Sequence, residues 1–378
     1  MSARLGYRLD GPEGAPAVVL CGSLGTTTAM WEPLLPALAA RHRVLRCDHR
    51  GHGDSEVPPG PYSIAEMGGD VLALLDELGV ERASFCGVSI GGMVGLWLAA
   101  EAPERIEGLA LLCTSARLGA PEWWDERIAT VKREGVESVA DAVVERWFTG
   151  GFAAREPGLA RELRDALAAT PAEGYAGCCA AIRDLDLRER LAAIRAPTLV
   201  LAALQDAATP LEHGAALAAG IPGARLAVLD GAAHLAAVER APEVAAMLAE
   251  HLEGGPGGRH ARGTAVRREV LGDAHVDAAN SATTAFDADF QRYLAGAAWA
   301  DVWAREGLDR RTRSAATLTA LLAANRMEEF ALHVRAARRN GLDEEGIAEV
   351  LLNAAVYLGV PAANDGFRVA KRVLGEEA

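Results

Sequence analysis

The chain has 378 residues, of which 50% are hydrophobic and 24% are charged, and its formal net charge is −14. This length is typical of two domains, and the composition excludes a disordered or fibrous chain. The acidic excess argues against a nucleic-acid partner, because a phosphate backbone needs a basic surface. No apolar run approaches about 18 residues, and the N-terminus lacks the apolar segment of a signal peptide. We therefore expect a cytoplasmic protein with no membrane span.

Short apolar runs alternate with amphipathic helical patterns over the first 252 residues. The runs are brief and flanked by turn residues, which is typical of buried strands in a parallel sheet. They cover residues 18–20, 44–47, 83–86, 106–113, 198–203 and 225–229. Helical patterns occur at 30–40, 64–78, 91–101, 211–219 and 242–251. This alternation predicts an α/β domain over 1–252, with a helical cap at about 119–195 where the rhythm breaks.

A serine stands where a predicted strand meets a helix, in the motif GVSIG at 87–91. A sharp strand-to-helix turn needs small neighbours, and it forces Ser89 out over the C-terminal edge of the sheet with the free N–H of Ile90 beside it. Asp206 and His234 each follow a later strand, in the chain order of a serine–acid–histidine triad. We predict that Ser89 is a nucleophile, that His234 is its base and that Asp206 orients the imidazole.

The clearest change of composition is the Gly/Pro-rich segment at 253–263, which we expect to be an irregular interdomain linker. Residues 264–378 have helical periodicity with clear stops, and helices are predicted at 310–324, at 327–339 and from Asp343 to 357. A helical domain of this size can build a small core or leave an apolar face that needs a partner. We predict an all-α second domain and a homo-oligomer formed through it.

Two ionisable residues of the second domain, Glu329 and His333, are four apart on one predicted helix. They can touch, although the spacing alone favours a solvated surface pair.

All six cysteines lie before residue 180, and none has metal-ligand spacing. They therefore give no sign of a metal site, and we interpret them as buried small side chains. We expect no metal and no cofactor.

Four further stretches of the first domain carry a family resemblance. They are 23–31 (SLGTTTAMW), 48–55 (DHRGHGDS), 179–187 (CAAIRDLDL) and 231–239 (GAAHLAAVE). With the serine motif they resemble the α/β-hydrolase fold and, more narrowly, the 3-oxoadipate enol-lactonases, over nearly all of 1–252. The resemblance implies that the second oxyanion N–H belongs to Leu24, and His49 and His52 are interpreted as loop-shaping. In the cap, Arg146 beside Trp147 is a candidate for binding a substrate carboxylate, with packing as the alternative role of the tryptophan.

Five stretches of the second domain carry another resemblance, at 268–275 (REVLGDAH), 299–303 (WADVW), 307–314 (GLDRRTRS), 329–333 (EFALH) and 360–364 (VPAAN). They resemble 4-carboxymuconolactone decarboxylase. Its superfamily includes alkylhydroperoxidases with a Cys-x-x-Cys pair, and the domain has no cysteine for that chemistry. On this resemblance we hypothesise that His333 donates a proton, that Glu329 orients it and that Arg313 holds a carboxylate. The rival histidine is His275, and the rival arginines are Arg310, Arg311 and Arg326.

The two resemblances imply consecutive reactions in the protocatechuate branch of the 3-oxoadipate pathway. A bifunctional enzyme would decarboxylate 4-carboxymuconolactone to 3-oxoadipate enol-lactone and then hydrolyse that lactone to 3-oxoadipate. Its expected partners are small carboxylate lactones. The alternative is a serine esterase or carbon–carbon bond hydrolase whose helical domain is only an oligomerisation module.

Overall fold

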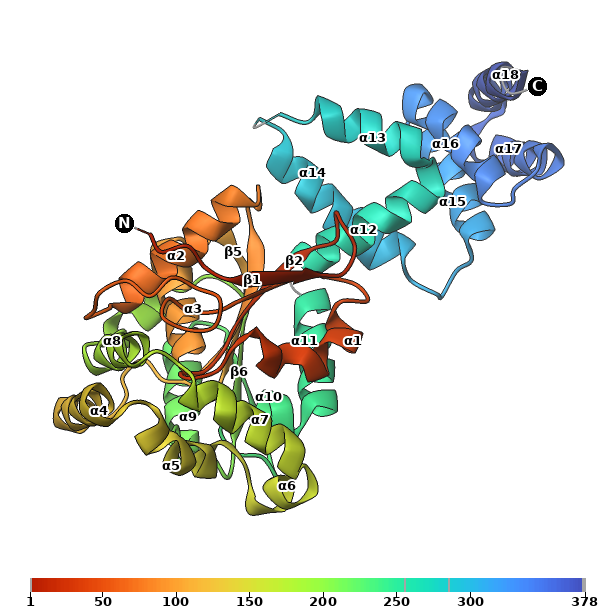
Figure 1. Ribbon diagram of the computed structural model, residues 1–378. Coiled ribbons are helices and arrows are strands. Elements are labelled where there is room, and N and C mark those ends of the chain that lie inside the picture. The colour runs from red at the N-terminus through yellow and green to blue at the C-terminus, as the bar shows by residue number, and fades with distance from the viewer. Residues whose placement is uncertain (1, 255, 285, 376–378) are drawn as a thin grey trace. The chain divides into compact units, whose positions relative to one another are not determined.

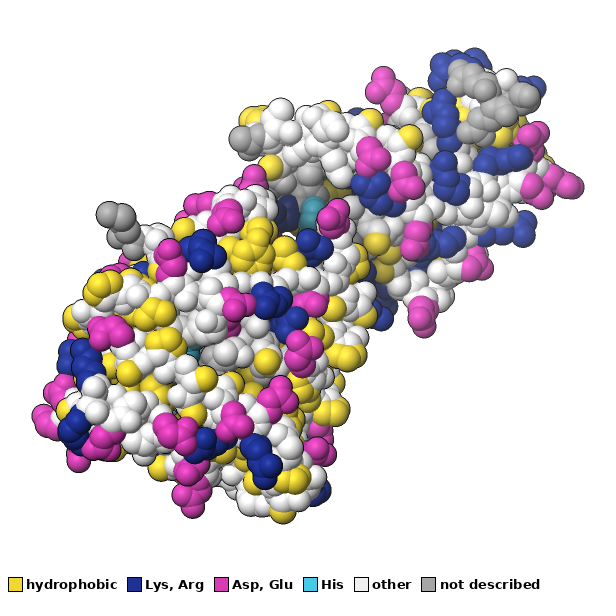
Figure 2. Space-filling view, in the orientation of Figure 1, with side chains coloured by type: hydrophobic (Ala, Val, Ile, Leu, Met, Phe, Trp, Pro, Cys, Tyr) yellow, Lys and Arg dark blue, Asp and Glu magenta, His cyan; other side chains and the backbone are white. Residues whose placement is uncertain are grey.

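The computed structural model describes residues 2–254, 256–284 and 286–375. The chain divides into two compact units, Met1–Gly257 and Gly258–Ala378, and the division falls inside the predicted linker segment (Figure 1). Among the described residues, no helix combines the length and the apolar character that crossing a membrane requires. Basic and acidic side chains are interspersed over the visible face of each unit (Figure 2).

Unit 1 is built on a seven-stranded sheet in the order β1-β3-β2-β4-β5-β6-β7. The strands are β1 (Tyr7–Asp10), β2 (Ala17–Cys21), β3 (Arg43–Cys47), β4 (Ala83–Val88), β5 (Ile106–Leu112), β6 (Thr198–Ala203) and β7 (Arg225–Leu229). Every pairing is parallel except that of β1 with β3. The sequence prediction of the six parallel strands is confirmed. The strand β1 was not predicted, because its four residues are mostly polar, are partly or fully exposed at the sheet edge and give no apolar run.

The register of this sheet brings the loops of interest together. Cys21 at the end of β2 is opposite Gly87 near the end of β4, so the segments that follow these strands emerge side by side. Ala203 at the end of β6 is likewise opposite Leu229 at the end of β7. Since parallel strands end at one edge of the sheet, Ser89, Asp206 and His234 are all carried to that edge.

Helices cover both faces of the sheet, with α2 and α3 packed together on one face and α1 and α11 on the other (Figure 1). The helices outside the cap are η1 (Thr28–Leu34), α1 (Leu35–Leu38), α2 (Ile64–Glu77), α3 (Ile90–Glu101), η2 (Pro103–Arg105), α9 (Leu211–Gly220), α10 (Ala236–Glu239) and α11 (Ala241–Gly254). The single helix predicted at 30–40 is instead a 3-10 turn followed by a four-residue helix. Pro33 and Pro36 explain this, since neither has an N–H to donate.

The predicted cap is present between β5 and β6. It consists of α4 (Pro121–Glu134), α5 (Glu137–Trp147), α6 (Gly150–Arg155), α7 (Pro157–Ala168), α8 (Ala172–Arg183) and η3 (Arg188–Ala193). Side chains of α4, α5 and α8 line a cavity together with Ser89 and His234. The cap therefore roofs the sheet edge at which the candidate triad lies.

All regular elements of unit 2 within residues 258–284 and 286–375 are helical, as predicted. They are α12 (which begins at Pro256 and ends at Leu271), α13 (Asp273–Ala282), α14 (Ala288–Leu294), η4 (Ala295–Trp303), α15 (Arg310–Ala323), α16 (Met327–Arg339), α17 (Glu344–Leu358) and α18 (Val360–Gly375). Helices α15 to α18 enclose one core around Phe330, and a second apolar cluster joins α12 and α13 to Trp299 and Trp303 of η4.

The expectation of an irregular linker is wrong for residues 256–263, which form the first two turns of α12. Pro256 suits the first turn of a helix, where no N–H partner is needed. Gly263 has a packing reason: a Cβ added there would lie 1.9 Å from the carbonyl oxygen of Ala295. The glycine thus permits close contact between α12 and η4, and this gain in packing outweighs its poor helix propensity.

Candidate active site

Ser89 occupies the turn between β4 and α3, with φ 58° and ψ −120°. This strained backbone is held by hydrogen bonds from the Ser89 N–H to Leu112 O (3.0 Å) and from Thr114 Oγ1 to Ser89 O (2.6 Å). The flanking glycines are required by space. A Cβ at Gly87 would lie 2.2 Å from the Gly91 backbone, and one at Gly91 would lie 2.2 Å from Cys21 O. The GVSIG motif therefore forms the predicted strand–turn–helix elbow.

His234 and Asp206 are in direct contact at the same edge of the sheet. Nδ1 of His234 lies 3.0 and 3.1 Å from the two carboxylate oxygens of Asp206. Asp206 also accepts hydrogen bonds from the Thr209 hydroxyl (2.6 Å) and from the N–H groups of Ala208 and Thr209. Burial opposes ionisation of Asp206, but His234 and Thr209 outweigh it and lower its pKa to about 2. The carboxylate is thus ionised and fixes the imidazole with Nδ1 protonated.

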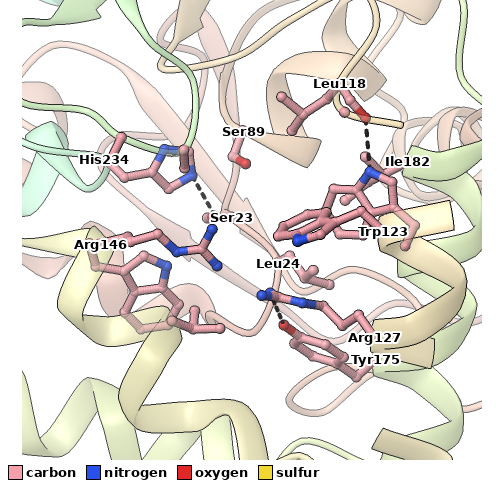
Figure 3. Close-up of a pocket in the computed structure, with 16 residues that line it drawn as sticks. Ser23, Leu24, Ser89, Leu118, Trp123, Arg127, Arg146, Tyr175, Ile182 and His234 are labelled. Carbon is pink, nitrogen blue, oxygen red and sulfur yellow. Dashed lines mark hydrogen bonds between the residues drawn. The ribbon is translucent and has the colours of Figure 1, made fainter. Parts of the chain in front are cut away.

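The other imidazole nitrogen of His234 faces the cavity that Ser89 lines (Figure 3). Nε2 lies 3.4 Å from the hydroxyl of Ser23, which donates to it when Nδ1 carries the proton. This arrangement brings a hydroxyl nucleophile, an unprotonated imidazole nitrogen and an orienting carboxylate to one wall of the cavity. Such a set can transfer an acyl group to and from a serine.

The segment 22–25, which contains Leu24, runs beside the elbow. The N–H of Gly91 donates to Gly22 O (3.2 Å), and Nε2 of His49 donates to the same oxygen (2.9 Å). His52 accepts a hydrogen bond from the Gly25 N–H at 3.0 Å. Burial and the neighbouring His49 lower the pKa of His52 to about 3, so it stays neutral and able to accept. Both histidines hold this loop, in agreement with their predicted loop-shaping role.

Leu24 lines the cavity beside Ser89, and Ile90 begins α3. The first N–H groups of a helix have no partner within the helix. The N–H of Ile90 is one of these, so the elbow offers a backbone donor next to the serine oxygen. The structure thus brings together Ser89, Asp206, His234 and the two predicted oxyanion segments.

The cavity has a volume of about 250 Å³ and is roofed by the cap. Both predicted substrate-binding residues, Arg146 and Trp147, line it. Trp147 also accepts a hydrogen bond at its carbonyl from the Leu235 N–H (2.9 Å), which ties α5 to the segment that carries His234.

A second arginine, Arg127, lines the cavity and was missed by the sequence analysis. Its guanidinium lies 4.6 Å from the Trp123 ring centre, and it donates to the Tyr175 hydroxyl at 3.3 Å. The guanidinium of Arg146, which projects from α5, lies 5.6 Å from the centre of the same Trp123 ring. The available signal was spacing: Arg127 is four residues after Trp123, so both project from one face of α4.

The two guanidinium groups point into the cavity that Ser89 faces (Figure 3). Burial and the charge of Arg127 lower the pKa of Arg146. Among the described residues, no ion pair with a carboxylate is formed by either arginine. The site therefore concentrates positive charge in a partly apolar cavity, which favours an anionic ligand.

In unit 2, Glu329 and His333 lie on α16 as predicted. The hypothesised hydrogen bond between Glu329 and the His333 ring is not made at Nδ1. This buried nitrogen has no hydrogen-bond partner among the described residues, and Glu329 is exposed. The His333 ring instead stacks on Trp303 with 6.2 Å between ring centres. Burial and then His275 lower the pKa of His333. Helical spacing gave the shared face correctly, but it did not identify the neighbours contributed by other helices.

Arg313 is half-buried on α15 and donates to Arg305 O at 2.7 Å, and its Nε has no partner among the described residues. Its rival Arg310 forms an ion pair with Glu269, with 2.6 Å between the charged atoms.

Over the described part of the chain, no group of three metal-ligating side chains is close enough to hold an ion. The six cysteines are buried, and none forms a disulfide.

Comparisons with known proteins match each unit to a different family. The alpha/beta hydrolase fold family matches residues 16–241, and the carboxymuconolactone decarboxylase family matches residues 288–372. The 3-oxoadipate enol-lactonase 2 of Acinetobacter baylyi is 39% identical over 236 residues, which are 62% of this chain and 88% of that protein. The 4-carboxymuconolactone decarboxylase of the same organism is 39% identical over 115 residues, which are 30% of this chain and 86% of that protein.

Among solved structures, the enol-lactonase from Burkholderia xenovorans LB400 superimposes with a TM-score of 0.65 at 44% identity. The match covers 66% of this chain and 96% of that one. The chain therefore belongs to the α/β-hydrolase fold family through unit 1 and is a fusion of that family with the carboxymuconolactone decarboxylase family, to which unit 2 belongs.

Proposed function

We propose that the chain is a bifunctional enzyme in which unit 2 decarboxylates 4-carboxymuconolactone and unit 1 hydrolyses the resulting 3-oxoadipate enol-lactone to 3-oxoadipate. The names of the two relatives describe consecutive steps, because the product of the decarboxylase is the substrate of the lactonase. Each unit matches most of the length of its relative, which supports two independent activities in one chain. The order of the units does not restrict the sequence of reactions, since a small lactone can diffuse.

In unit 1, Ser89 attacks the acyl carbon of the lactone while Nε2 of His234 accepts its proton. Asp206 keeps the imidazole in the required tautomer and stabilises the imidazolium that forms. The N–H groups of Leu24 and Ile90 stabilise the oxyanion. The ring C–O bond then breaks, and the enol leaving group takes a proton and becomes a ketone. Water, activated by His234, releases the second carboxylate and restores Ser89.

The observation that carries this assignment is the pair of arginines in the cavity of Ser89. The enol-lactone bears one carboxylate on a short side chain, and a general esterase has no need of a cationic cavity. Arg127 and Arg146 offer fork-shaped donors in a partly desolvated site, where a charge-assisted hydrogen bond is strong. The carboxylate would anchor there, in the same cavity that Ser89 lines.

In unit 2, the lactone loses CO2 from the ring carbon that bears the carboxyl group. The electron pair of the broken C–C bond moves through the ring double bond toward the lactone carbonyl, so the reaction needs no external electron acceptor. A proton from a protein acid then adds to a ring carbon, and solvent reprotonates that acid. His333 is the proposed acid.

The test gives 4-carboxymuconolactone alone to the purified chain and follows CO2 release, lactone absorbance and 3-oxoadipate. The wild type should form one CO2 and one 3-oxoadipate per substrate. The Ser89→Ala variant should release CO2 at the normal rate and accumulate enol-lactone. Loss of both activities in this variant would contradict the division of labour, and a wild type that releases no CO2 would contradict the decarboxylase assignment.

A further inference from the structure

Four buried side-chain nitrogens of unit 2 have no hydrogen-bond partner among the described residues. They belong to Arg267, Trp299, Arg313 and His333. Buried polar groups in folded proteins are nearly always paired, because desolvation without a partner is unfavourable. A set of such atoms in one small domain indicates donors that a ligand is expected to meet.

Three of these residues belong to one region of the unit. The rings of Trp303 and His333 stack at 6.2 Å, and those of Trp299 and Trp303 lie at 5.5 Å. The immediate chain neighbours of Arg267 and His275, which are Val266 and Val276, pack in the same apolar cluster as both tryptophans. His333 on α16 therefore contacts a tryptophan of η4 directly, and Arg267 and His275 lie on α12 and α13, the two helices that pack against both tryptophans.

The charges of this region are unbalanced. Burial and then Arg267 lower the pKa of His275, and burial and then His275 lower the pKa of His333. No carboxylate contributes to the shift of either histidine, and burial alone lowers the pKa of Arg267. The next residue, Arg268, is different, because it pairs with Asp273 and Asp277.

The backbone of η4 is also unusual. The N–H of Ala304 donates to Trp299 O at 3.0 Å, a bond across five residues that widens the helix. Such π-helical turns are uncommon and occur frequently at functional sites. Here the wide turn carries both tryptophans, so their rings form one apolar wall beside the His333 ring.

We propose that Arg267, His275 and His333 form the substrate site of unit 2, in which Arg267 binds a carboxylate of the lactone and the two histidines deliver the proton. This inference rests on the proposed decarboxylase function. It replaces Arg313 by Arg267 as the carboxylate ligand, and it replaces Glu329 by His275 as the partner of His333. Trp303 stacks on His333 and fixes its ring.

The chemistry balances with these groups alone. The substrate enters as a dianion, and its negative charge favours the protonated form of an imidazole beside it. The C–C bond to the leaving carboxylate breaks, CO2 departs, and the electron pair passes into the ring. The imidazolium proton then adds to carbon, and water restores the proton to the imidazole.

The test measures CO2 release by the full chain with single substitutions in unit 2. Arg267→Gln should raise KM roughly tenfold or more, because a hydrogen bond to a charged group is lost, and Arg267→Lys should recover part of that affinity. Arg268→Gln is the matched control and should behave as the wild type. His275→Gln should lower kcat by about 100-fold, whereas Glu329→Gln should leave it nearly unchanged.

Two further measurements separate binding from folding. The saturated-ring analogue of the lactone lacks the double bond that accepts the electron pair, so its calorimetric titration reports binding without reaction. Its affinity should fall in Arg267→Gln and persist in His275→Gln. Hydrolysis of enol-lactone by unit 1 should be normal in every variant. If Arg267→Gln does not fold, Arg267→Lys takes its place in the test. An increase in its KM would support carboxylate binding by Arg267, and a wild-type KM would contradict it.

The outcomes distinguish this inference from the proposed function. A wild type without CO2 release overturns both. A wild type that releases CO2, with Arg267→Gln and His275→Gln indistinguishable from Arg268→Gln, overturns this site alone. Strong loss in Glu329→Gln with an active His275→Gln would restore Glu329 as the partner of His333.

Discussion

At the scale of single residues, the ionisation of Asp206 links the site to the stability of unit 1. Its pKa is lowered to about 2 because His234 and Thr209 outweigh the effect of burial. The unfolded value is about 3.9, so the carboxylate stabilises the fold above about pH 4 and loses this effect as the pH falls through 2. The difference between the two pKa values corresponds to roughly 2.6 kcal/mol.

We therefore predict that the gap in free energy of unfolding between the wild type and Asp206→Asn narrows as the pH falls below 4. Urea unfolding of unit 1 at a series of pH values measures this gap. Acidic groups common to both proteins cancel in the comparison. A gap that stays constant down to the lowest pH at which unit 1 remains folded would contradict the assigned shift.

Arg127 gives a second prediction at this scale. Arg127→Ala should raise KM for the enol-lactone roughly tenfold and leave hydrolysis of an uncharged ester such as 4-nitrophenyl acetate unchanged, since only the lactone carries a carboxylate. Arg133→Ala is the control, because Arg133 lies on the same helix and pairs with exposed Glu134. Equal losses with both substrates would mean that Arg127 serves to pack Trp123.

The residues whose positions in the fold the sequence predicted are those that local structure determines. Ser89 is fixed by its own glycines, and Asp206 and His234 by the ends of their strands. Arg127 and His275 owe their proposed roles to neighbours from other helices. The spacing from Trp123 indicates only which face of α4 carries Arg127, and the sequence names His275 only as a rival of His333. Their surroundings became apparent from tertiary packing.

At the scale of elements, the Gly/Pro-rich segment shows where composition misleads. Glycine and proline are poor in a helix interior, yet residues 256–263 are helical. The penalty is offset at Gly263 by the close approach of α12 to η4, which a local pattern cannot reveal. Strand β1 was missed for a related reason, since an edge strand owes its pairing to β3 rather than to its own apolar side chains.

This packing predicts the effect of Gly263→Ala. The substitution raises helix propensity but forces a Cβ to within 1.9 Å of the Ala295 carbonyl oxygen, so it should destabilise unit 2 by roughly 1–3 kcal/mol. Gly69→Ala in α2 is the control, because an added Cβ there meets no atom within 4 Å. It should be neutral or stabilise unit 1 by up to about 1 kcal/mol. Thermal unfolding monitored by circular dichroism measures both, and an equally stable Gly263→Ala would show that α12 can shift freely.

At the scale of the whole molecule, unit 2 leaves an apolar face uncovered. On α17 the side chains of Leu352 and Val356 are one helical turn apart, and Val356 and Tyr357 are 78% and 80% exposed. Val360, just after this helix, is 66% exposed. Monomeric soluble proteins rarely expose such groups of large apolar side chains together. We propose that a second copy of the chain covers this face.

A self-complementary contact buries the same apolar residues on both copies, so one charge introduced on the face is buried twice. Val356→Asp should therefore reduce a wild-type oligomer toward the monomer, as measured by light scattering after size-exclusion chromatography. Val57→Asp is the control, because Val57 is an exposed apolar residue of unit 1. Hydrolysis by unit 1 should survive in both variants, since all three residues of its proposed triad lie in unit 1 of the same chain. A monomeric wild type would contradict the proposal, and an oligomer unchanged by Val356→Asp would place the contact on another face.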